Sequence, residues 1–217
     1  MKLLSVHSAK SIWLIPTNYL NPRGLFLRPA MIALKDRYSF ASSPIEKPPA
    51  TEKDALKFEQ GAFKGRDRVP VTVNMTIHED GIVIETRSST NDGDLFLEDA
   101  LTWISTNFGL PAHDALPIKK IYASDLFIKF EKTPRIFDKR LAPFLKEVEE
   151  LIEGGQKGAI DFFSFGLSTD PGLSERPLTF RFERRVNTPA SDNQYYSFAP
   201  IKTELHLKLL ERLEEVG

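Results

Sequence analysis

The stretch VPVTVNMTIHEDGIVIETRSSTNDGDLFLEDALTWISTNFG (residues 69–109) decides the fold, because it combines a β-hairpin with an amphipathic helix. Its first ten residues alternate between apolar and polar side chains, with valine, methionine or isoleucine at every second position from Val69 to Ile77. A period of two is typical of a strand with one buried face. The sequence therefore predicts a half-buried strand at the start of this stretch.

The dipeptide Asp80-Gly81 follows the strand and favours a two-residue type I′ turn, in which both central residues have positive φ. Such a turn places Ile77 opposite Ile84 on the second strand. Cross-strand partners share a face, so the apolar residues of both strands then lie on one side of the sheet. The turn and the alternation thus predict the same buried face.

A helix is predicted over the remainder of the stretch. Asp94 is the expected N-terminal cap, and apolar residues then recur at helical spacing. They are Leu97, Leu101, Ile104 and Phe108, with Phe96, Ala100 and Trp103 widening the stripe. Gly109 and Pro111 form a stop signal, because glycine adopts the left-handed conformation and proline cannot continue the helix. Two strands and a helix that agree in this way predict a packed core.

The composition is that of a globular chain with little overall charge. The 217 residues are 41% hydrophobic and include 16 phenylalanines, which is enough for a substantial core. The net charge of -1 gives no general attraction to nucleic acid or membranes. The lack of cysteine excludes disulfides, thiolate metal ligands and a cysteine nucleophile. We expect a cytoplasmic protein with no cofactor and no membrane-spanning segment.

Further elements are predicted on both sides of this stretch. They are strands at 11–15, 30–41 and 56–62, a proline-rich loop or arm at 42–54, a strand at 122–130, a helix at 142–152, strands at 160–167 and 178–185, and a helix from residue 200. Several N-terminal strands are thus followed by the order ββαβαββα. This order predicts an α+β fold, with a mostly antiparallel sheet and about three helices packed on one side. We expect a single domain over residues 1–217.

Common catalytic motifs are missing from the sequence. It contains no P-loop, no dinucleotide-binding glycine motif and no H-E-x-x-H metal motif. The glycine-rich residues 154–158 follow a helix instead of joining a strand to a helix, so they are interpreted as a helix end and a turn. Asp92, Asp94 and His113 suggest a metal-dependent hydrolase as one alternative hypothesis. Acidic residues are also expected at a helix start, and helix capping is the favoured interpretation.

Basic residues suggest a second alternative, a protein that associates with nucleic acid. The candidate residues are Arg66, Arg68, Arg181, Arg184 and Arg185. Tyr195 and Tyr196 lie in what the sequence indicates to be a polar loop after the second cluster. Arginine can bind phosphates and aromatic rings can stack on bases. Acidic residues interrupt both clusters, so a solvated surface is the simpler interpretation unless the clusters share one sheet face.

The last helix favours a role in binding other proteins. Its candidate partner-binding residues are Leu205, Leu207, Leu209 and Leu213. Packing of this helix on its own core is the simpler explanation, but leucine covers more than a narrow stripe. With the arm at 42–54, this leads to the main hypothesis: a non-catalytic binding or assembly protein, either a homo-oligomer or an accessory subunit of a larger intracellular complex.

Overall fold

The computed structural model describes the whole chain except residues 49–54, 133–141, 152–163, 171, 173–177 and 217. Its elements are β1 (Lys2–Leu14), α1 (Thr17–Leu20), α2 (Arg28–Tyr38), β2 (Leu56–Lys64), β3 (Pro70–His78), β4 (Gly81–Thr86), α3 (Thr90–Phe108), the 3-10 helix η1 (His113–Ala115), β5 (Lys119–Lys129), α4 (Ala142–Leu151), β6 (Ser164–Ser168), β7 (Thr179–Arg184), the 3-10 helix η3 (Ala190–Asp192), β8 (Gln194–Ala199) and α5 (Thr203–Val216).

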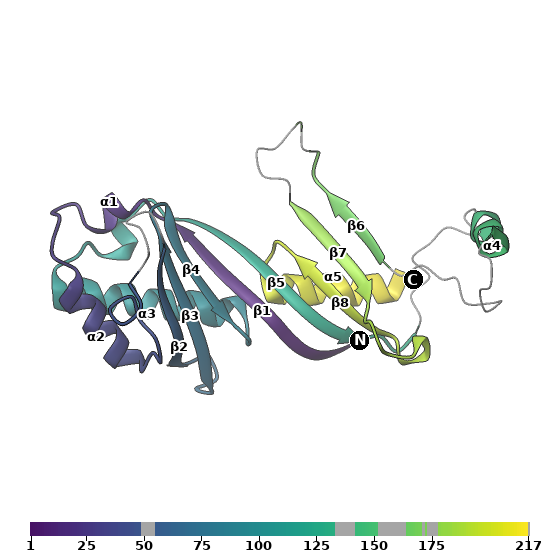
Figure 1. The fold of residues 1–217 in the computed structure, drawn as a ribbon, viewed down its shortest axis with the longest axis horizontal. Coiled ribbons are helices and arrows are strands. Elements are labelled where there is room, and N and C mark those ends of the chain that lie inside the picture. Colours follow the sequence, from purple (N-terminus) through teal and green to yellow (C-terminus); the bar gives the residue numbers. More distant parts are fainter. Residues whose placement is uncertain (49–54, 133–141, 152–163, 171, 173–177, 217) are drawn as a thin grey trace. The chain divides into compact units, whose positions relative to one another are not determined.

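The strands form one eight-stranded sheet with the order β2-β3-β4-β1-β5-β8-β7-β6 (Figure 1). The pairs β1–β4, β2–β3, β3–β4, β6–β7 and β7–β8 are all antiparallel. The predicted α+β class is therefore confirmed. The predicted glycine-rich turn at 154–158 lies outside the described residues. In the parts of the chain that are described, no helix is long and apolar enough to cross a membrane.

The chain divides into two compact units, which are treated separately below. The hairpin unit consists of Val6–Asp125 and Pro200–Leu205. The C-terminal unit consists of Met1–Ser5, Leu126–Ala199 and His206–Gly217. The elements β1, β5 and α5 contribute residues to both units. Folding of residues 1–217 as a single domain stays a prediction.

The core of the hairpin unit contains the predicted apolar face of β3 and β4. Val73 and Ile84 on these strands are fully buried, and so are Phe96 and Leu97 on α3. Helix α2 adds Leu34 to the same cluster, so α2 and α3 cover the same face of the hairpin. The helical stripe and the buried hairpin face are thus confirmed, because both periodicities match the surfaces that pack together.

The register of the hairpin differs from the prediction by two residues. The turn lies at residues 79–80, and Ile77 pairs with Ile82 instead of Ile84. A shift of two residues returns each side chain to the same face, whereas a shift of one would reverse it. The buried face is therefore as predicted although the pairing is wrong.

Gly81 has a different role from the one predicted. Positive φ occurs at Gly24 and Gly109 among the described glycines, but not at Gly81. A Cβ atom at position 81 would lie 2.5 Å from the carbonyl oxygen of Trp13 on β1. Glycine is needed here because β1 approaches the backbone closely.

Helix α3 begins earlier than predicted and has a different cap. Ser89 is the N-cap residue, and its hydroxyl oxygen accepts a hydrogen bond from the backbone N–H of Asp92. The Ser89 hydroxyl in turn donates to the Asp92 carboxylate at 2.8 Å. Asp94 therefore lies inside the helix, and its prediction as the cap is wrong. The predicted stop is confirmed, because Gly109 has φ 69° at the C-cap.

The predicted strand at 30–41 is instead mostly the helix α2. Its buried residues Ala30, Leu34 and Tyr38 are spaced four positions apart. This spacing fits one face of a helix, and it also fits every second inward position of a strand. Ile32 separates the two interpretations, since a strand would bury it with the others and the helix leaves it 43% exposed. The strand prediction is wrong because the apolar residues of this segment fit the period of a strand as well as that of a helix.

The predicted loop or arm at 42–54 is described only as far as residue 48. Ser42 forms an isolated β-bridge with Glu59 on β2, and Ser43 and Pro44 are buried. The first half of this segment therefore packs against β2 within the hairpin unit. The remaining residues of the predicted arm lie outside the described residues.

The C-terminal unit has a strand that the sequence analysis missed. Tyr195 lies in β8, where Tyr195, Ser197 and Ala199 are buried and the residues between them are half-buried. The prediction of a polar loop is wrong because serine and tyrosine occupy the inward positions and conceal the alternation. From α5, His206 and Leu210 are fully buried, and the Ser197 hydroxyl lies 2.8 Å from His206 Nε2.

Candidate ligand-binding site

An apolar cavity of about 410 Å³ lies within the hairpin unit. Among the described residues that line it, all but two are apolar and none carries a charge. They are Asn18, Leu20, Asn21, Leu27, Ala30, Met31, Leu34, Leu56, Met75, Ile77, Ile82, Leu97, Ala100, Leu101, Ile104 and Leu110. Ligand sites typically have volumes of about 300–1,000 Å³, with mainly hydrophobic linings and few polar groups. The cavity has this character.

The cavity continues the core of the hairpin unit. Helix α2 contributes Ala30 and Leu34, and helix α3 contributes Ala100 and Ile104, so each helix uses the stripe that also faces the sheet. Alanine has the smallest apolar side chain that lines the cavity. We infer that alanine on both helices helps to leave the space open, since larger residues at core positions interdigitate.

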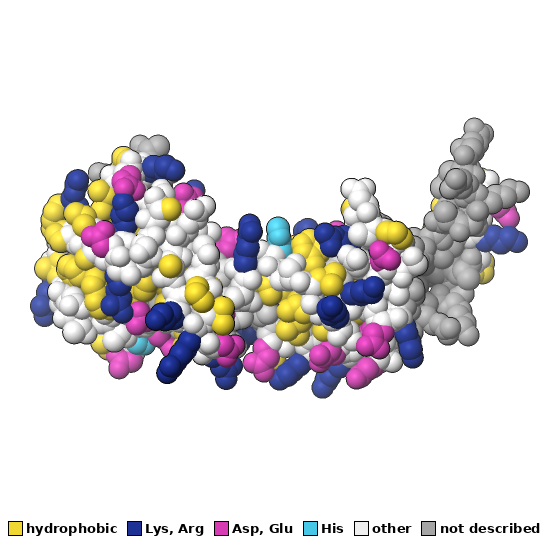
Figure 2. All heavy atoms as spheres, turned by 90° about the horizontal axis from the view of Figure 1, so that it is seen from below, with side chains coloured by type: hydrophobic (Ala, Val, Ile, Leu, Met, Phe, Trp, Pro, Cys, Tyr) yellow, Lys and Arg dark blue, Asp and Glu magenta, His cyan; other side chains and the backbone are white. Residues whose placement is uncertain are grey.

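Apolar side chains are also exposed on the segment that runs from α1 to α2. Phe26 is 78% exposed, and Tyr19, Leu25 and Ile32 are each at least 40% exposed. Figure 2 shows hydrophobic side chains gathered at the left end of the visible face, the end at which Figure 1 draws α2. Exposed apolar groups of this kind often mark a place where a ligand or partner binds.

A second cavity of about 320 Å³ adjoins the first in the hairpin unit. The two cavities share Asn21 and Leu110 in their linings. The second lining is more polar and includes the exposed guanidinium of Arg23. Asn21 fixes the intervening loop, because its side-chain amide donates to the Leu25 carbonyl at 2.9 Å and accepts from the Leu25 N–H at 2.8 Å.

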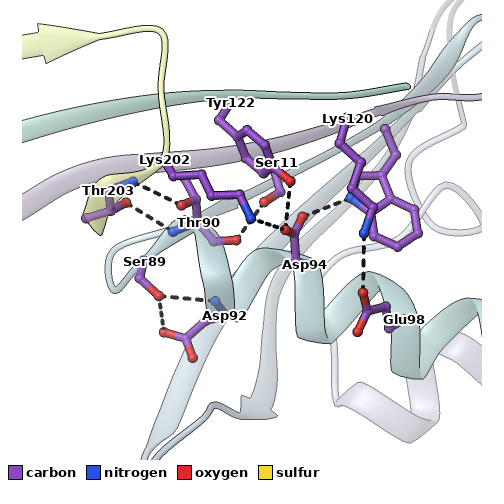
Figure 3. Close-up of polar contacts among 11 residues, drawn as sticks. Ser11, Ser89, Thr90, Asp92, Asp94, Glu98, Lys120, Tyr122, Lys202 and Thr203 are labelled. Atoms are coloured by element: carbon purple, nitrogen blue, oxygen red, sulfur yellow. Dashed lines mark hydrogen bonds and ion pairs between the residues drawn. The ribbon is translucent and has the colours of Figure 1, made fainter. Parts of the chain in front are cut away.

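A cluster of polar contacts surrounds Asp94 on another side of α3 (Figure 3). Its carboxylate accepts hydrogen bonds from the indole N–H of Trp13 and the hydroxyl of Tyr122, each at 2.9 Å. The ammonium of Lys202 lies 3.6 Å from the same carboxylate. Burial, together with the hydrogen bond to Asp94, raises the pKa of Tyr122, so its hydroxyl stays a donor at neutral pH. Asp94 thus joins α3 to β1, β5 and the segment before α5.

Two buried threonines make a second connection between distant segments. The backbone N–H of Thr90 donates to the hydroxyl of Thr203, and the N–H of Thr203 donates to the hydroxyl of Thr90, both at 3.1 Å. These residues begin α3 and α5, where backbone N–H groups have no partner within the helix. Each helix start is therefore capped by a side chain of the other (Figure 3).

The structure gives the predicted metal residues separate partners. Asp92 accepts hydrogen bonds from the Ser89 hydroxyl and from the backbone N–H of Arg66, so it ties the turn after β2 to α3. Asp94 has the three donors described above. His113 Nδ1 lies 3.4 Å from the Thr102 hydroxyl. Over the described ranges, no three residues of the types His, Cys, Asp or Glu come together as a metal site would require.

The five predicted arginines belong to different units. Arg66 and Arg68 are exposed in the turn between β2 and β3 of the hairpin unit. Arg181 and Arg185 are exposed on the C-terminal unit, where alternation along β7 places both on one sheet face. Arg184 is directed to the opposite face and is half-buried.

Aromatic rings share the sheet face of Arg181 and Arg185. Phe127 on β5 lies 5.6 Å from Tyr196 on β8, between ring centroids, and the Arg185 guanidinium lies 5.0 Å from the Phe127 ring. Phe198 pairs directly with Arg181 across the strands. We call Phe127, Tyr196, Phe198, Arg181 and Arg185 the aromatic face. The same face includes an acidic group, Glu183, which pairs with Tyr196.

The predicted partner-binding leucines of α5 differ in exposure. Leu205 is 51% exposed and Leu209 is 43% exposed, whereas Leu207 and Leu213 are half-buried. Leu210, which lies between them, is fully buried. The helix therefore packs partly on its own core, and the exposed leucines are the two separated by four residues.

Sequence reasoning missed the two cavities and two residues of the aromatic face. The described cavity lining comes from six helices and strands and from the loops beside them, so no local pattern identifies it. The alternation of β8 places Phe198 on the same sheet face as Tyr196, but it is recognisable only if Tyr195 and Ser197 are taken as the buried residues. The chain matches no protein-family model, and no curated protein sequence matches it.

Proposed function

We propose that the protein acts by binding, without catalysis, and that its ligand is a small and mainly hydrocarbon molecule held in the apolar cavity. The observation that carries this proposal is the 410 Å³ cavity with an uncharged lining. The described residues of the lining include no acid, base or nucleophile, which supports binding better than chemistry.

The size of the cavity sets the size of the ligand. An apolar cavity of ~150 Å³ stays dry and binds benzene. The apolar cavity here, at about 410 Å³, has room for a ligand larger than benzene. Transfer of that much apolar surface out of water supplies the driving force, at ~25 cal/mol per Å². Of the two asparagines in the lining, Asn21 already bonds to the backbone of Leu25, so Asn18 is the one proposed to orient a ligand.

Titration with the neutral fluorescent probe N-phenyl-1-naphthylamine tests this function. We expect saturable binding of one probe per chain, seen as a rise in fluorescence. Ala100→Leu adds bulk at a position that is 2% exposed and lines the cavity, so it should weaken binding at least about tenfold. The matched control is Ala62→Leu on β2, where the side chain is exposed.

Circular dichroism and a melting curve must show that both variants fold. Equal probe affinity in folded Ala100→Leu and the wild type would place the probe elsewhere. Failure of the wild type to bind any probe would remove the proposed function. The further hypothesis of a homo-oligomer or accessory subunit stays a prediction, and light scattering on the purified protein measures it directly.

A second candidate function is the binding of single-stranded nucleic acid to the aromatic face. The specific observation is that two exposed arginines and three half-buried rings lie on one face of the C-terminal unit. Single-strand sites combine cationic side chains along the backbone with rings on which bases stack, worth about 1–3 kcal/mol per base. Against this candidate, Glu183 adds a negative charge to the same face.

Fluorescence anisotropy with labelled oligonucleotides of thymidine and uridine tests the second candidate. The paired change Arg181→Gln and Arg185→Gln should weaken binding and lower the salt slope by about 1.4, at ~0.7 per lost contact. The control is the same change at Arg66 and Arg68 in the other unit. Loss of affinity only in the control would move the site to the hairpin unit, and an unbound wild type would discard the candidate.

A further inference from the structure

We propose that the ligand is a single-chain amphiphile whose hydrocarbon part fills the apolar cavity and whose carboxylate binds Arg23 in the adjoining cavity. This inference rests on the proposed function and specifies the ligand class of the same site. It is carried by the contrast between two neighbouring cavities, one apolar and one polar, within the hairpin unit.

The two cavities are adjacent, because Asn21 and Leu110 line both. The proposed ligand passes these two residues, with its hydrocarbon part on one side and its polar end on the other. The larger space has no charged residue in its lining, and the smaller one has Arg23. A ligand with a hydrocarbon chain and one polar end matches this arrangement.

The charge of Arg23 defines the polar end. Its guanidinium is exposed, and no ion pair or hydrogen bond to it is seen among the residues that the structure describes. Guanidinium has a planar set of donors that binds a carboxylate through two parallel hydrogen bonds. Arg23 is the sole charged residue in either described lining, so a ligand with one negative charge balances it.

The loop that carries Arg23 is held in place before any ligand binds. Both groups of the Asn21 side-chain amide bond to the backbone of Leu25. The N–H of Gly24 donates to the Asn21 carbonyl at 3.1 Å, and Gly24 has φ 59°, a conformation that glycine adopts without strain. A preformed loop loses little conformational freedom on binding, which favours affinity.

A series of ligands with the same chain tests the inference. Dodecanoate, dodecanol and dodecyltrimethylammonium should compete with N-phenyl-1-naphthylamine for the apolar cavity. We expect dodecanoate to compete at least about tenfold better than dodecanol, and the cation to be weakest. Arg23→Gln should remove that advantage of dodecanoate and leave dodecanol unchanged. The matched control is Arg28→Gln, at another exposed arginine of the same segment.

The outcomes separate this inference from the proposed function. Absence of probe binding to the wild type overturns the function itself. Probe binding with equal competition by the anionic and neutral chains keeps the function and overturns the role of Arg23. Preference for dodecanoate that survives in Arg23→Gln, or that disappears in Arg28→Gln, also overturns the assignment to Arg23. Loss of the preference in Arg23→Gln alone supports it.

Discussion

The two units each contain an aromatic cluster that the other lacks. In the hairpin unit, Tyr38, Phe40, Phe58 and Phe96 pack against one another in the interior, with Phe96 only 4.7 Å from Tyr38 between ring centroids. In the C-terminal unit, the rings of the aromatic face remain half-buried. The comparison teaches that the same residue type builds a core where helices cover the sheet and stays half-buried on a sheet face that they leave open.

The units also differ in where space is left. Aromatic rings fill one part of the hairpin core, while the neighbouring part is lined by aliphatic residues and alanine and contains the apolar cavity. The C-terminal unit stacks Phe182 on Tyr195 with centroids 4.7 Å apart on the side that faces α5. Each unit therefore has one closely packed aromatic region and one region suited to binding.

The largest expected effect comes from removal of a buried ring. Phe96→Ala removes a fully buried side chain of the hairpin core and should lower the free energy of unfolding by about 3–5 kcal/mol. Phe198→Ala, on the half-buried aromatic face, should lower it by about 1 kcal/mol or less. Urea unfolding measures both free energies. Similar losses in the two variants would contradict the distinction between a buried aromatic core and a half-buried aromatic face.

Removal of the Asp94 carboxylate should have the next largest effect. In Asp94→Ala, the buried indole N–H of Trp13 and the half-buried hydroxyl of Tyr122 lose their acceptor, and an unsatisfied buried group costs about 1–3 kcal/mol. Glu98→Gln on the same helix is the control, because its pair with Lys120 is largely exposed and contributes at most about 1 kcal/mol. Thermal unfolding should show a larger loss of stability for Asp94→Ala than for Glu98→Gln. The reverse order would show that the contacts of Asp94 contribute little to stability.

A smaller effect is expected at the paired helix starts. Thr90→Val removes the hydroxyl that accepts from the Thr203 N–H and should cost about 1–2 kcal/mol. Thr106→Val, at an exposed position of the same helix, should change stability by about 0.5 kcal/mol or less. Chemical unfolding of both variants gives the difference. Equal values would mean that water replaces the lost bond.

The smallest effect concerns alkaline pH. Burial, followed by hydrogen bonding to acidic residues, raises the pKa of Tyr38 and of Tyr122 above the ordinary value of about 10. The folded state therefore holds these protons more tightly than the unfolded state. Their contribution to stability is complete below pH ~10 and is lost as pH rises through the folded pKa values. Ultraviolet absorbance of tyrosinate measures the ionisation, and Tyr38→Phe and Tyr122→Phe should each lose part of the absorbance change that the wild type shows at the most alkaline pH.

Local sequence patterns correctly predicted those elements whose buried residues recur at the regular spacing of a strand or a helix. The alternation of β3 and β4 and the stripe of α3 identify the buried surface of the hairpin unit without any knowledge of its neighbours. The stop at Gly109 was equally local, since it depends on one backbone conformation. The failures at α2 and β8 arose where buried positions fit two periods, or where polar residues face inward.

The candidate sites were mostly beyond reach of the sequence. Four of the five candidate arginines are exposed and Arg184 is half-buried, and their role in binding nucleic acid stays a prediction. Their division between two units is a property of the tertiary structure. Asp92 and Asp94 looked alike as neighbouring acids at a helix start. In the structure one completes the cap and the other is surrounded by donors from β1, β5 and the segment before α5.

By itself, the sequence determined the α+β class, the buried face of the hairpin, and the helix with its stop, because these depend on residues close together in the chain. Tertiary structure alone decided the register against β1, the partners of Asp94, the aromatic face and both cavities. Gly81 shows the reason: its need for a small side chain is created by Trp13, a residue 68 positions earlier in the chain. A contact between distant segments leaves no periodic pattern in either one.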